Sequence, residues 1–200
     1  MSNTAVTAEL GSIALPDPTL GRAAPLLELL AKRRSSRNFS PKPLPLDVLS
    51  ALLWAGFGIN RRATGGRTAP SAHDWQEIEV FAVLPDGAYR YDAAAHTLHL
   101  ARTGDLRALT GVQDFVGGAP LDLVYVADFA KMSDATDEQR TFFASADAAV
   151  IAENVYLFCA AADLATVVRG LLDRRKLATA LGLAVNERIV LAQTVGYPAR

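Results

Sequence analysis

Apolar residues recur along the chain in two periods, one typical of helices and one typical of strands. Apolar faces at a spacing of three to four residues predict helices over residues 24–34, 46–57, 144–162 and 174–181. Runs of β-branched and aromatic residues, or alternating apolar and polar positions, predict strands over residues 78–84, 88–92, 97–101, 121–127 and 189–195.

The order of these elements favours an α+β fold. The predicted strands are not separated by regular crossover helices, as a doubly wound parallel sheet requires. Half of the 200 residues are hydrophobic, which is enough for one sizeable core. Residues 1–22 are expected to form an irregular N-terminal arm, because Pro16 and Pro18 interrupt regular structure, and residues 23–200 to form the domain.

Two polar stretches are predicted to lie outside these elements. Residues 60–71 are rich in Gly, Thr and Arg, which is typical of a loop. Residues 133–140, SDATDEQR, are predicted to be a solvated surface segment. His96 and His99 would point to opposite faces of a strand, so no metal site is expected there.

The overall composition excludes several classes of protein. A net charge of −1 and a pI of about 6.3 argue against a dedicated nucleic-acid binder. The single cysteine, Cys159, excludes an internal disulfide and a Cys-based zinc cluster, and its apolar surroundings predict a buried thiol. The apolar window 144–168 contains charged residues, so we expect a buried helix rather than a membrane span. No secretory leader is evident, which favours the cytoplasm; a leader outside this sequence would place the protein in the periplasm.

A basic cluster is the most distinctive local feature. Residues 32–39, KRRSSRNF, place four Lys and Arg residues within six positions, directly after an apolar run. The cations could complement the negative end of a helix dipole, or the arginines and serines could bind a phosphate. In an extended backbone, Arg33, Ser35 and Arg37 would share one face, and Arg34 and Ser36 the other. From the residues alone, both explanations stay open.

Familiar catalytic motifs do not explain the chain. The stretch GFGINR at residues 56–61 lacks the third glycine of a dinucleotide-binding loop and follows a predicted helix. The sequence has no phosphate-binding GxxxxGK[ST] loop and no GxSxG elbow. Nothing in it predicts a catalytic triad or dyad.

Several longer segments together carry a resemblance. RRSSRNFSPKPLPLDVLSALLWAGFGINR, GRTAPSAHDWQEIEVFAV, AYRYDAAAHTLHL, AENVYLFCAAADLATVVRG and VGYP follow one another between about Leu26 and Pro198. This order resembles the FMN-dependent nitroreductase family, and most closely its SagB-type dehydrogenase branch. The resemblance implies a central antiparallel sheet flanked by helices in an intertwined homodimer, with two FMN sites at the subunit interface, each built from both chains.

The resemblance also implies which residues contact FMN. Arg33 and Arg34 would approach the phosphate and the ribityl chain. Ser35 and Arg37 would sit near the pyrimidine end of the ring, where a cation stabilises the charge of reduced flavin.

Two further segments would touch the ring. Pro70, Ser71 and Ala72 match a segment that lies against the flavin in the family. Val168, Arg169 and Gly170 belong to a loop that supplies a backbone N–H to N5. Only the backbone of Arg169 is required, so its side chain could be a surface cation.

Two positions depart from the family pattern. Asp74 stands where the family often has Asn, and an ionised carboxylate can only accept a hydrogen bond. Arg200 would have to replace a basic residue that many relatives use to hold the phosphate.

The function implied is that of an FMN oxidoreductase with a ping-pong mechanism. NAD(P)H would pass hydride to flavin N5, and a small acceptor such as a nitroaromatic, a quinone or an enone would then be reduced. No catalytic side chain is required, because the cofactor carries the chemistry. Two alternatives stay open: a SagB-type dehydrogenase that oxidises a peptide or metabolite, and a non-catalytic flavin-binding or interaction module.

Overall fold

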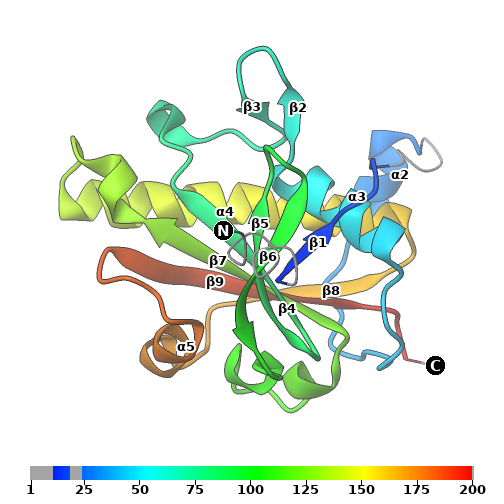
Figure 1. Ribbon diagram of the computed structural model, residues 1–200. Coiled ribbons are helices and arrows are strands. Elements are labelled where there is room, and N and C mark those ends of the chain that lie inside the picture. Colours follow the sequence, from blue (N-terminus) through cyan, green and yellow to red (C-terminus); the bar gives the residue numbers. More distant parts are fainter. Residues whose placement is uncertain (1–10, 19–23, 200) are drawn as a thin grey trace, which may run out of the picture.

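The computed structural model describes residues 11–18 and 24–199. Its centre is a seven-stranded sheet with the order β1-β6-β5-β4-β7-β9-β8, in which every neighbouring pair is antiparallel (Figure 1). The strands are β1 (Ser12–Ala14), β4 (Ile78–Leu84), β5 (Gly87–Asp92), β6 (Thr97–Thr103), β7 (Leu121–Asp128), β8 (Ala165–Arg169) and β9 (Glu187–Gly196). A separate short hairpin joins β2 (Ile59–Arg61) to β3 (Gly66–Arg67).

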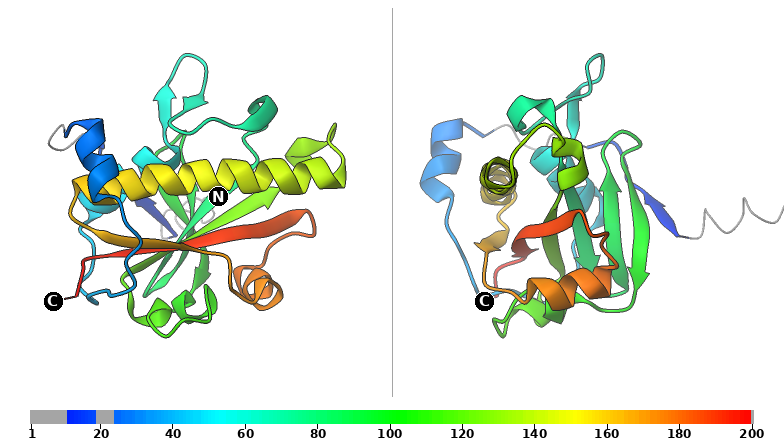
Figure 2. Two further views of the ribbon diagram at one scale, coloured as in Figure 1. Left: turned by 180° about the vertical axis from the view of Figure 1, so that it is seen from behind. Right: turned by 90° about the vertical axis from the view of Figure 1, so that its left-hand side faces the viewer.

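Helices cover both faces of the sheet. They are α2 (Leu26–Lys32), α3 (Leu46–Phe57), α4 (Asp137–Ala161) and α5 (Arg174–Leu181). The long helix α4 runs across the strands (Figure 2). The predicted α+β fold with a central antiparallel sheet is therefore confirmed.

The core divides into two apolar clusters because side chains alternate along each strand. In β4, Ile78, Val80 and Ala82 pack in the cluster that includes residues of α3 and α4. Phe81 and Val83 of the same strand pack in the cluster that includes residues of α5. The helices α3 and α4 thus cover one face of the sheet, and α5 covers the other.

Helix α4 begins earlier than the sequence predicted. Its first residue is Asp137, inside the stretch expected to be a solvated surface segment, whereas the predicted start was residue 144. The reason is a capping box: Thr136 Oγ1 accepts from the Gln139 N–H at 3.3 Å, and Gln139 Oε1 accepts from the Thr136 N–H at 2.9 Å. The polar residues are largely exposed, as predicted, but they are helical.

By length and composition alone, α4 would be long and apolar enough to cross a membrane. Instead, its apolar face is part of the protein core. The buried residues of α4 are Ala144, Asp147, Ala148, Ile151, Ala152, Val155, Tyr156 and Cys159. This is the arrangement of a core helix, and Cys159 is the buried thiol that the sequence predicted.

The N-terminal arm is not wholly irregular. Strand β1 pairs with β6 at the edge of the sheet, where Ile13 lies opposite Leu98. Pro16 follows the strand rather than interrupting it, and its carbonyl oxygen accepts a hydrogen bond from Ser50 Oγ. Residues 1–10 and 19–22 of the predicted arm lie outside the described residues, and the division into an arm and a domain stays a prediction.

Two other predicted boundaries change. The predicted loop at residues 60–71 contains the hairpin of β2 and β3. The helix predicted at residues 24–34 is shorter, because Arg33 already has an extended backbone with φ −55° and ψ 123°. Of the basic cluster, only Lys32 therefore belongs to the helix, and the residues from Arg33 onward follow it.

Replacing Thr136 with Ala should destabilise the protein by about 0.5–2 kcal/mol, because the first turn of α4 loses its cap. The measurement is the free energy of unfolding from urea titration. Ser145→Ala is the matched control: its exposed hydroxyl bonds only to the Thr141 carbonyl oxygen of the same helix, so a change within about 0.5 kcal/mol is expected. Equal effects of the two changes would contradict the capping role.

Candidate functional site

The segment after α2 runs beside the edge of the sheet. Strand β8 is the last strand in the order, so one side of its backbone is not paired with another strand. On that side, the Thr166 carbonyl oxygen accepts from the Ser36 N–H at 2.9 Å. The Val168 N–H donates to the Tyr156 hydroxyl at 2.9 Å. Two residues further on, the Gly170 N–H has no hydrogen-bond partner within residues 11–18 and 24–199.

Tyr156 joins three parts of this region. Its hydroxyl lies 2.8 Å from Ser35 Oγ in addition to its bond with the Val168 N–H, and the residue is only 5% exposed. The Arg33 guanidinium lies over the Tyr156 ring, 5.3 Å from its centroid, and 4.0 Å from Glu153 of the same helix. Tyr156 thus positions Arg33 and Ser35 against α4.

Asn154, two residues before Tyr156 on α4, has a different role. The Asn154 amide donates to the Gly56 carbonyl oxygen at 3.4 Å, which is a helix-packing contact. Tyr156 could have been found from its position on the buried face of α4, because a buried tyrosine usually needs a partner for its hydroxyl.

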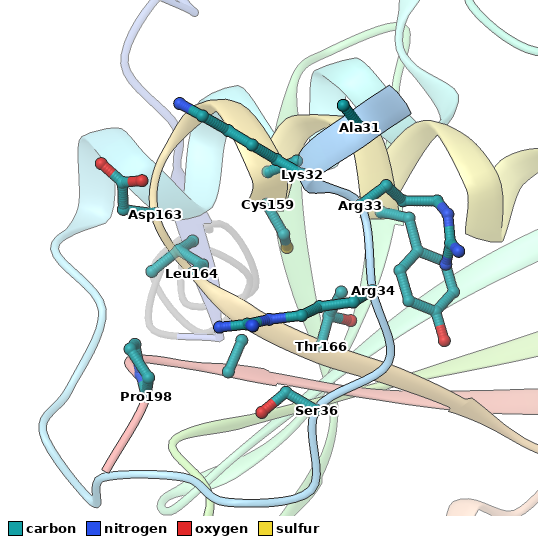
Figure 3. A pocket seen from close by; sticks show the side chains of 13 residues that line it. Ala31, Lys32, Arg33, Arg34, Ser36, Cys159, Asp163, Leu164, Thr166 and Pro198 are labelled. Atoms are coloured by element: carbon teal, nitrogen blue, oxygen red, sulfur yellow. The ribbon is translucent and has the colours of Figure 1, made fainter. Parts of the chain in front are cut away.

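Arg34 and Ser36 lie on the other face of the extended segment, as the alternation predicted. Together with Lys32 and Arg33 they line a cleft of about 490 Å³ that also contacts Thr166 of β8. Figure 3 shows Lys32 and Arg34 extending to the side opposite Arg33. Three cations against one acidic lining residue, Asp163, make this cleft suited to an anion.

The Pro70–Ala72 segment is held by two buried carboxyl groups. Ser71 Oγ donates to Glu77 Oε2 at 3.1 Å, and the Ala72 N–H donates to Asp147 Oδ2 at 2.8 Å. Sequence reasoning had not singled out either acid as a site residue, and Glu77 lies in a stretch of polar residues.

The loop after Ala72 is unusual. His73, Asp74 and Gln76 all have left-handed φ angles, of 52°, 55° and 48°. Asp74 accepts a hydrogen bond from the Gln76 side chain at 2.9 Å. The Trp75 indole stacks on the His73 ring and donates to Asp134, which fixes its orientation.

The two groups of predicted flavin contacts lie apart in one chain. Ala72 is tied to Asp147, whereas Ser35 and Val168 are tied to Tyr156. Nine positions separate Asp147 from Tyr156, which is about 14 Å along a helix. Figure 1 accordingly shows α2 near one end of α4 and the short η1 turn (Ala72–Asp74), in teal, nearer the other end.

The side chain of Arg169 is not a surface cation, which corrects that alternative. It is 5% exposed and donates to Asp122 Oδ1 at 2.8 Å, to the Thr110 carbonyl oxygen at 2.6 Å and to Thr194 Oγ1 at 3.1 Å. Burial raises the pKa of Asp122 to about 6, although Arg169 opposes that change. Burial also lowers the pKa of Arg169. Only the backbone of Arg169 is therefore available to a ligand.

The remaining predicted site residues add no further contact. Arg37 is exposed and forms no ion pair with the described residues. Arg200 lies outside the described residues. Within the described ranges, no group of three His, Cys, Asp or Glu side chains could hold a metal ion.

Residues 30–197 match the family description "Nitroreductase family", which covers most of the chain. The chain belongs to the nitroreductase family. A crystal structure from Ralstonia eutropha JMP134, provisionally named a nitroreductase, is 49% identical and has a TM-score of 0.90, covering 94% of this chain and 90% of that one.

More distant relatives agree with this assignment. A provisionally named nitroreductase of Methanocaldococcus jannaschii is 28% identical over 72% of this chain and 78% of its own length. The structure of the NADPH:FMN oxidoreductase of Vibrio harveyi was solved in complex with NAD+. It has a TM-score of 0.65 at 20% identity and covers 88% of this chain and 69% of that chain. This similarity supports the fold alone.

The predicted family is thus confirmed, and membership in the nitroreductase family implies an oxidoreductase. The narrower likeness to the SagB-type branch stays a prediction.

Replacing Asp122 with Asn should destabilise this nitroreductase-family protein by about 3–5 kcal/mol, because Arg169 would stay buried without its counter-charge. Urea unfolding measures the loss. Asp137→Asn is the control, since Asp137 pairs with Arg140 at the surface and should contribute no more than about 1 kcal/mol. A loss at Asp122 no larger than at Asp137 would contradict the structural role of the Arg169 pair.

Proposed function

We propose that the protein is an FMN-dependent oxidoreductase that takes hydride from NAD(P)H and delivers it to a small acceptor such as a nitroaromatic, a quinone or an enone. The observation that carries this proposal is the basic cleft beside the unpaired edge of β8. The cleft supplies cations for a phosphate. Further along the same edge, the Gly170 N–H, which has no partner among the described residues, could donate to a flat, hydrogen-bonding ring.

The residues of the cleft fit FMN in size and chemistry. Its volume of about 490 Å³ lies in the range of cofactor sites. Lys32 and Arg34 extend to one side as charge-assisted donors for a phosphate, and Arg33 lines the cleft from the opposite side, over the Tyr156 ring. Gly170 lies outside the lining of the cleft, just after β8; among the described residues, an added Cβ there would meet Leu191 alone, at 3.8 Å, so a ligand can approach the backbone closely.

When bound, FMN would accept hydride at N5 and pass it to the acceptor in a second step. The protein's part is to bind and orient. The Gly170 N–H has no partner among the described residues and would donate to the ring, and Tyr156 holds Ser35 beside Val168, two residues before Gly170. The exposed cation Arg37 would offset the negative charge that reduced flavin accumulates. No side chain needs to act as an obligatory acid or base.

The proposed FMN site is completed by a second copy of the chain. The outward face of α4 exposes apolar side chains, including Phe142, Ala146 and Val150, and the nearby helix α2 exposes Leu27. Exposed apolar surface of this kind marks a protein contact. A two-fold axis brings the same surface of each partner together. With this axis perpendicular to α4, the two α4 helices would pack antiparallel against each other.

This packing would bring the separated halves of the site together. If the two α4 helices cross near Val150, residue 147 of one copy lies opposite residue 153 of the other. In this chain, Asp147 holds Ala72, and Glu153 lies beside Arg33. The Pro70–Ala72 segment of one copy would then face the Arg33 cleft of the other.

The first test is a visible absorption spectrum of the purified protein, followed by NADH or NADPH without oxygen. We expect a two-band flavin spectrum that bleaches and recovers when a nitroaromatic or a quinone is added. A flavin spectrum that does not bleach would favour the dehydrogenase that oxidises a peptide or metabolite. Absence of flavin, even after incubation with FMN, would favour the interaction module and overturn the proposal.

Replacing Arg33 with Ala should weaken FMN binding by about 1.5–3 kcal/mol, through the loss of a charge-assisted phosphate contact. The measurement is titration of the apoprotein with FMN, followed by flavin fluorescence. Arg188→Ala is the control, because Arg188 is an exposed cation at the start of β9, outside the lining of the cleft. Equal affinities of wild type and Arg33→Ala would contradict the phosphate assignment.

Mixed dimers test whether each site uses both chains. Arg33→Ala damages the cleft, and Ala72→Trp would block the opposite half sterically. A heterodimer of these variants contains one site with both defects and one intact site. We expect about half of the wild-type FMN sites per dimer, whereas sites built within a single chain would show no recovery.

A further inference from the structure

Two buried acids lie behind the Pro70–Ala72 segment. Glu77, just before β4, is fully buried, and Asp147 of α4 is 8% exposed. Buried carboxyl groups are costly unless they are hydrogen-bonded or neutralised. Neither acid contacts the basic cleft described above, so the burial of each carboxyl group needs another explanation.

Each acid fixes one polar group of the segment. Glu77 Oε2 accepts from the Ser71 hydroxyl at 3.1 Å, and Asp147 Oδ2 accepts from the Ala72 N–H at 2.8 Å. The Ser71 hydroxyl also accepts from the Gln76 N–H at 2.9 Å, so its proton is committed to Glu77. The segment can then offer a ligand its backbone and an oxygen lone pair, but not the hydroxyl proton.

The second carboxyl oxygen of Glu77 lacks a hydrogen-bond partner. Among the described residues, this atom, Oε1, is buried and unpaired. Burial raises the pKa of Glu77, and the neighbouring Asp147 raises it further by its charge and by hydrogen bonding. Two ionised carboxylates cannot hydrogen-bond to each other, because neither has a proton to donate. One added proton both removes a like-charge pair and gives Oε1 a hydrogen to donate.

Other charged groups near Glu77 have different partners. Lys131, after β7, lies 3.3 Å from the Gln76 carbonyl oxygen and 3.5 Å from Glu79. Asp74 accepts from the Gln76 side chain. Ser71 opposes the effect of Asp147 on the Glu77 pKa, but burial has the largest effect. Arg67 donates to the Gln76 side chain at 2.8 Å and to the Phe57 carbonyl oxygen at 3.1 Å. Among the described residues, neither Arg67 nor Lys131 forms an ion pair with Glu77 or Asp147.

We propose that Glu77 is protonated in the folded protein and shares this proton with Asp147 through a hydrogen bond, which holds Ser71 and Ala72 in the conformation that contacts FMN. Glu77 is then a positioning residue of the proposed site, and this part of the inference rests on the proposed function. The strained loop supports it: with left-handed angles at His73, Asp74 and Gln76, the chain needs a firm anchor on either side.

The shared proton predicts a direction for the pH dependence of stability. An acid whose pKa is higher in the folded than in the unfolded state binds more protons when folded. Stability should therefore fall as the pH rises above 4.5, the ordinary value for Glu, and level off once the folded-state pKa is passed. Glu77→Gln removes this slope, because the amide keeps an oxygen for Ser71 and an N–H group for Asp147.

The first experiment measures urea unfolding of the apoprotein between pH 4.5 and 9 for wild type, Glu77→Gln and Glu79→Gln. Glu79 is the matched control, because it lies two residues away and pairs with Arg90 and Lys131. We expect the stability of wild type and Glu79→Gln to fall with pH and that of Glu77→Gln to fall less. The same slope in all three proteins overturns the shared proton. If Glu77→Gln does not fold, Asp147→Asn replaces it, and an unreduced slope there overturns the proposal.

The second experiment measures FMN dissociation constants over the same pH range. In wild type, affinity should weaken as the pH rises, by about 2- to 10-fold, the worth of one hydrogen bond. In Glu77→Gln the affinity should stay within about twofold of its value at low pH. A pH dependence of FMN binding that is equal in both proteins overturns the positioning role. If wild type binds no FMN, the proposed function fails, and the unfolding experiment still decides whether the proton is shared.

Discussion

The two segments that carry the candidate flavin contacts are each tied to α4 by one buried polar side chain. Tyr156 holds the basic segment and the edge of β8, and Asp147 holds the Pro70–Ala72 segment. A buried polar group is costly without a partner, so each bond resists displacement more than a surface contact does. The spacing of these two residues along one rigid helix therefore sets the distance between the two halves of the site.

The supporting residues are buried, whereas most of the ligand-facing ones are exposed. Arg34, Ser35 and Arg37 are open to solvent, whereas Tyr156 and the Arg169–Asp122 pair at the end of β8 are buried. Exposed cations alone would be mobile and would hold an anion weakly. By ordering Ser35 and Arg33, Tyr156 reduces the entropy that a ligand would otherwise have to overcome on binding.

Sequence patterns predicted the regular elements better than the contacts between them. The observed bounds of α3, β4 and α5 equal the predicted ones, because apolar period and flanking breakers agree there. The predicted start of α4 was wrong, because the capping box consists of polar residues, and a polar stretch in the sequence resembles a loop. Glu77 and Asp147 are 70 positions apart, and only the fold places both behind Ser71 and Ala72. Tyr156 was not predicted for a related reason. On the apolar buried face of a helix, a tyrosine looks the same in sequence as any other core residue until the partners of its hydroxyl are known.

The position of Asp147 and Tyr156 on α4 also explains why one chain should not suffice. A flavin can contact both segments only if they face each other, and a straight helix keeps its own two attachment points about 14 Å apart. In the proposed dimer, antiparallel pairing of two such helices would reverse their order in the partner, so the turn that holds Ala72 in one copy would approach the turn that lies beside Arg33 in the other. On this argument, the proposed site is complete only when two folded α4 helices pack together through their exposed apolar faces. A change that separates the helices should abolish flavin binding while each chain stays folded.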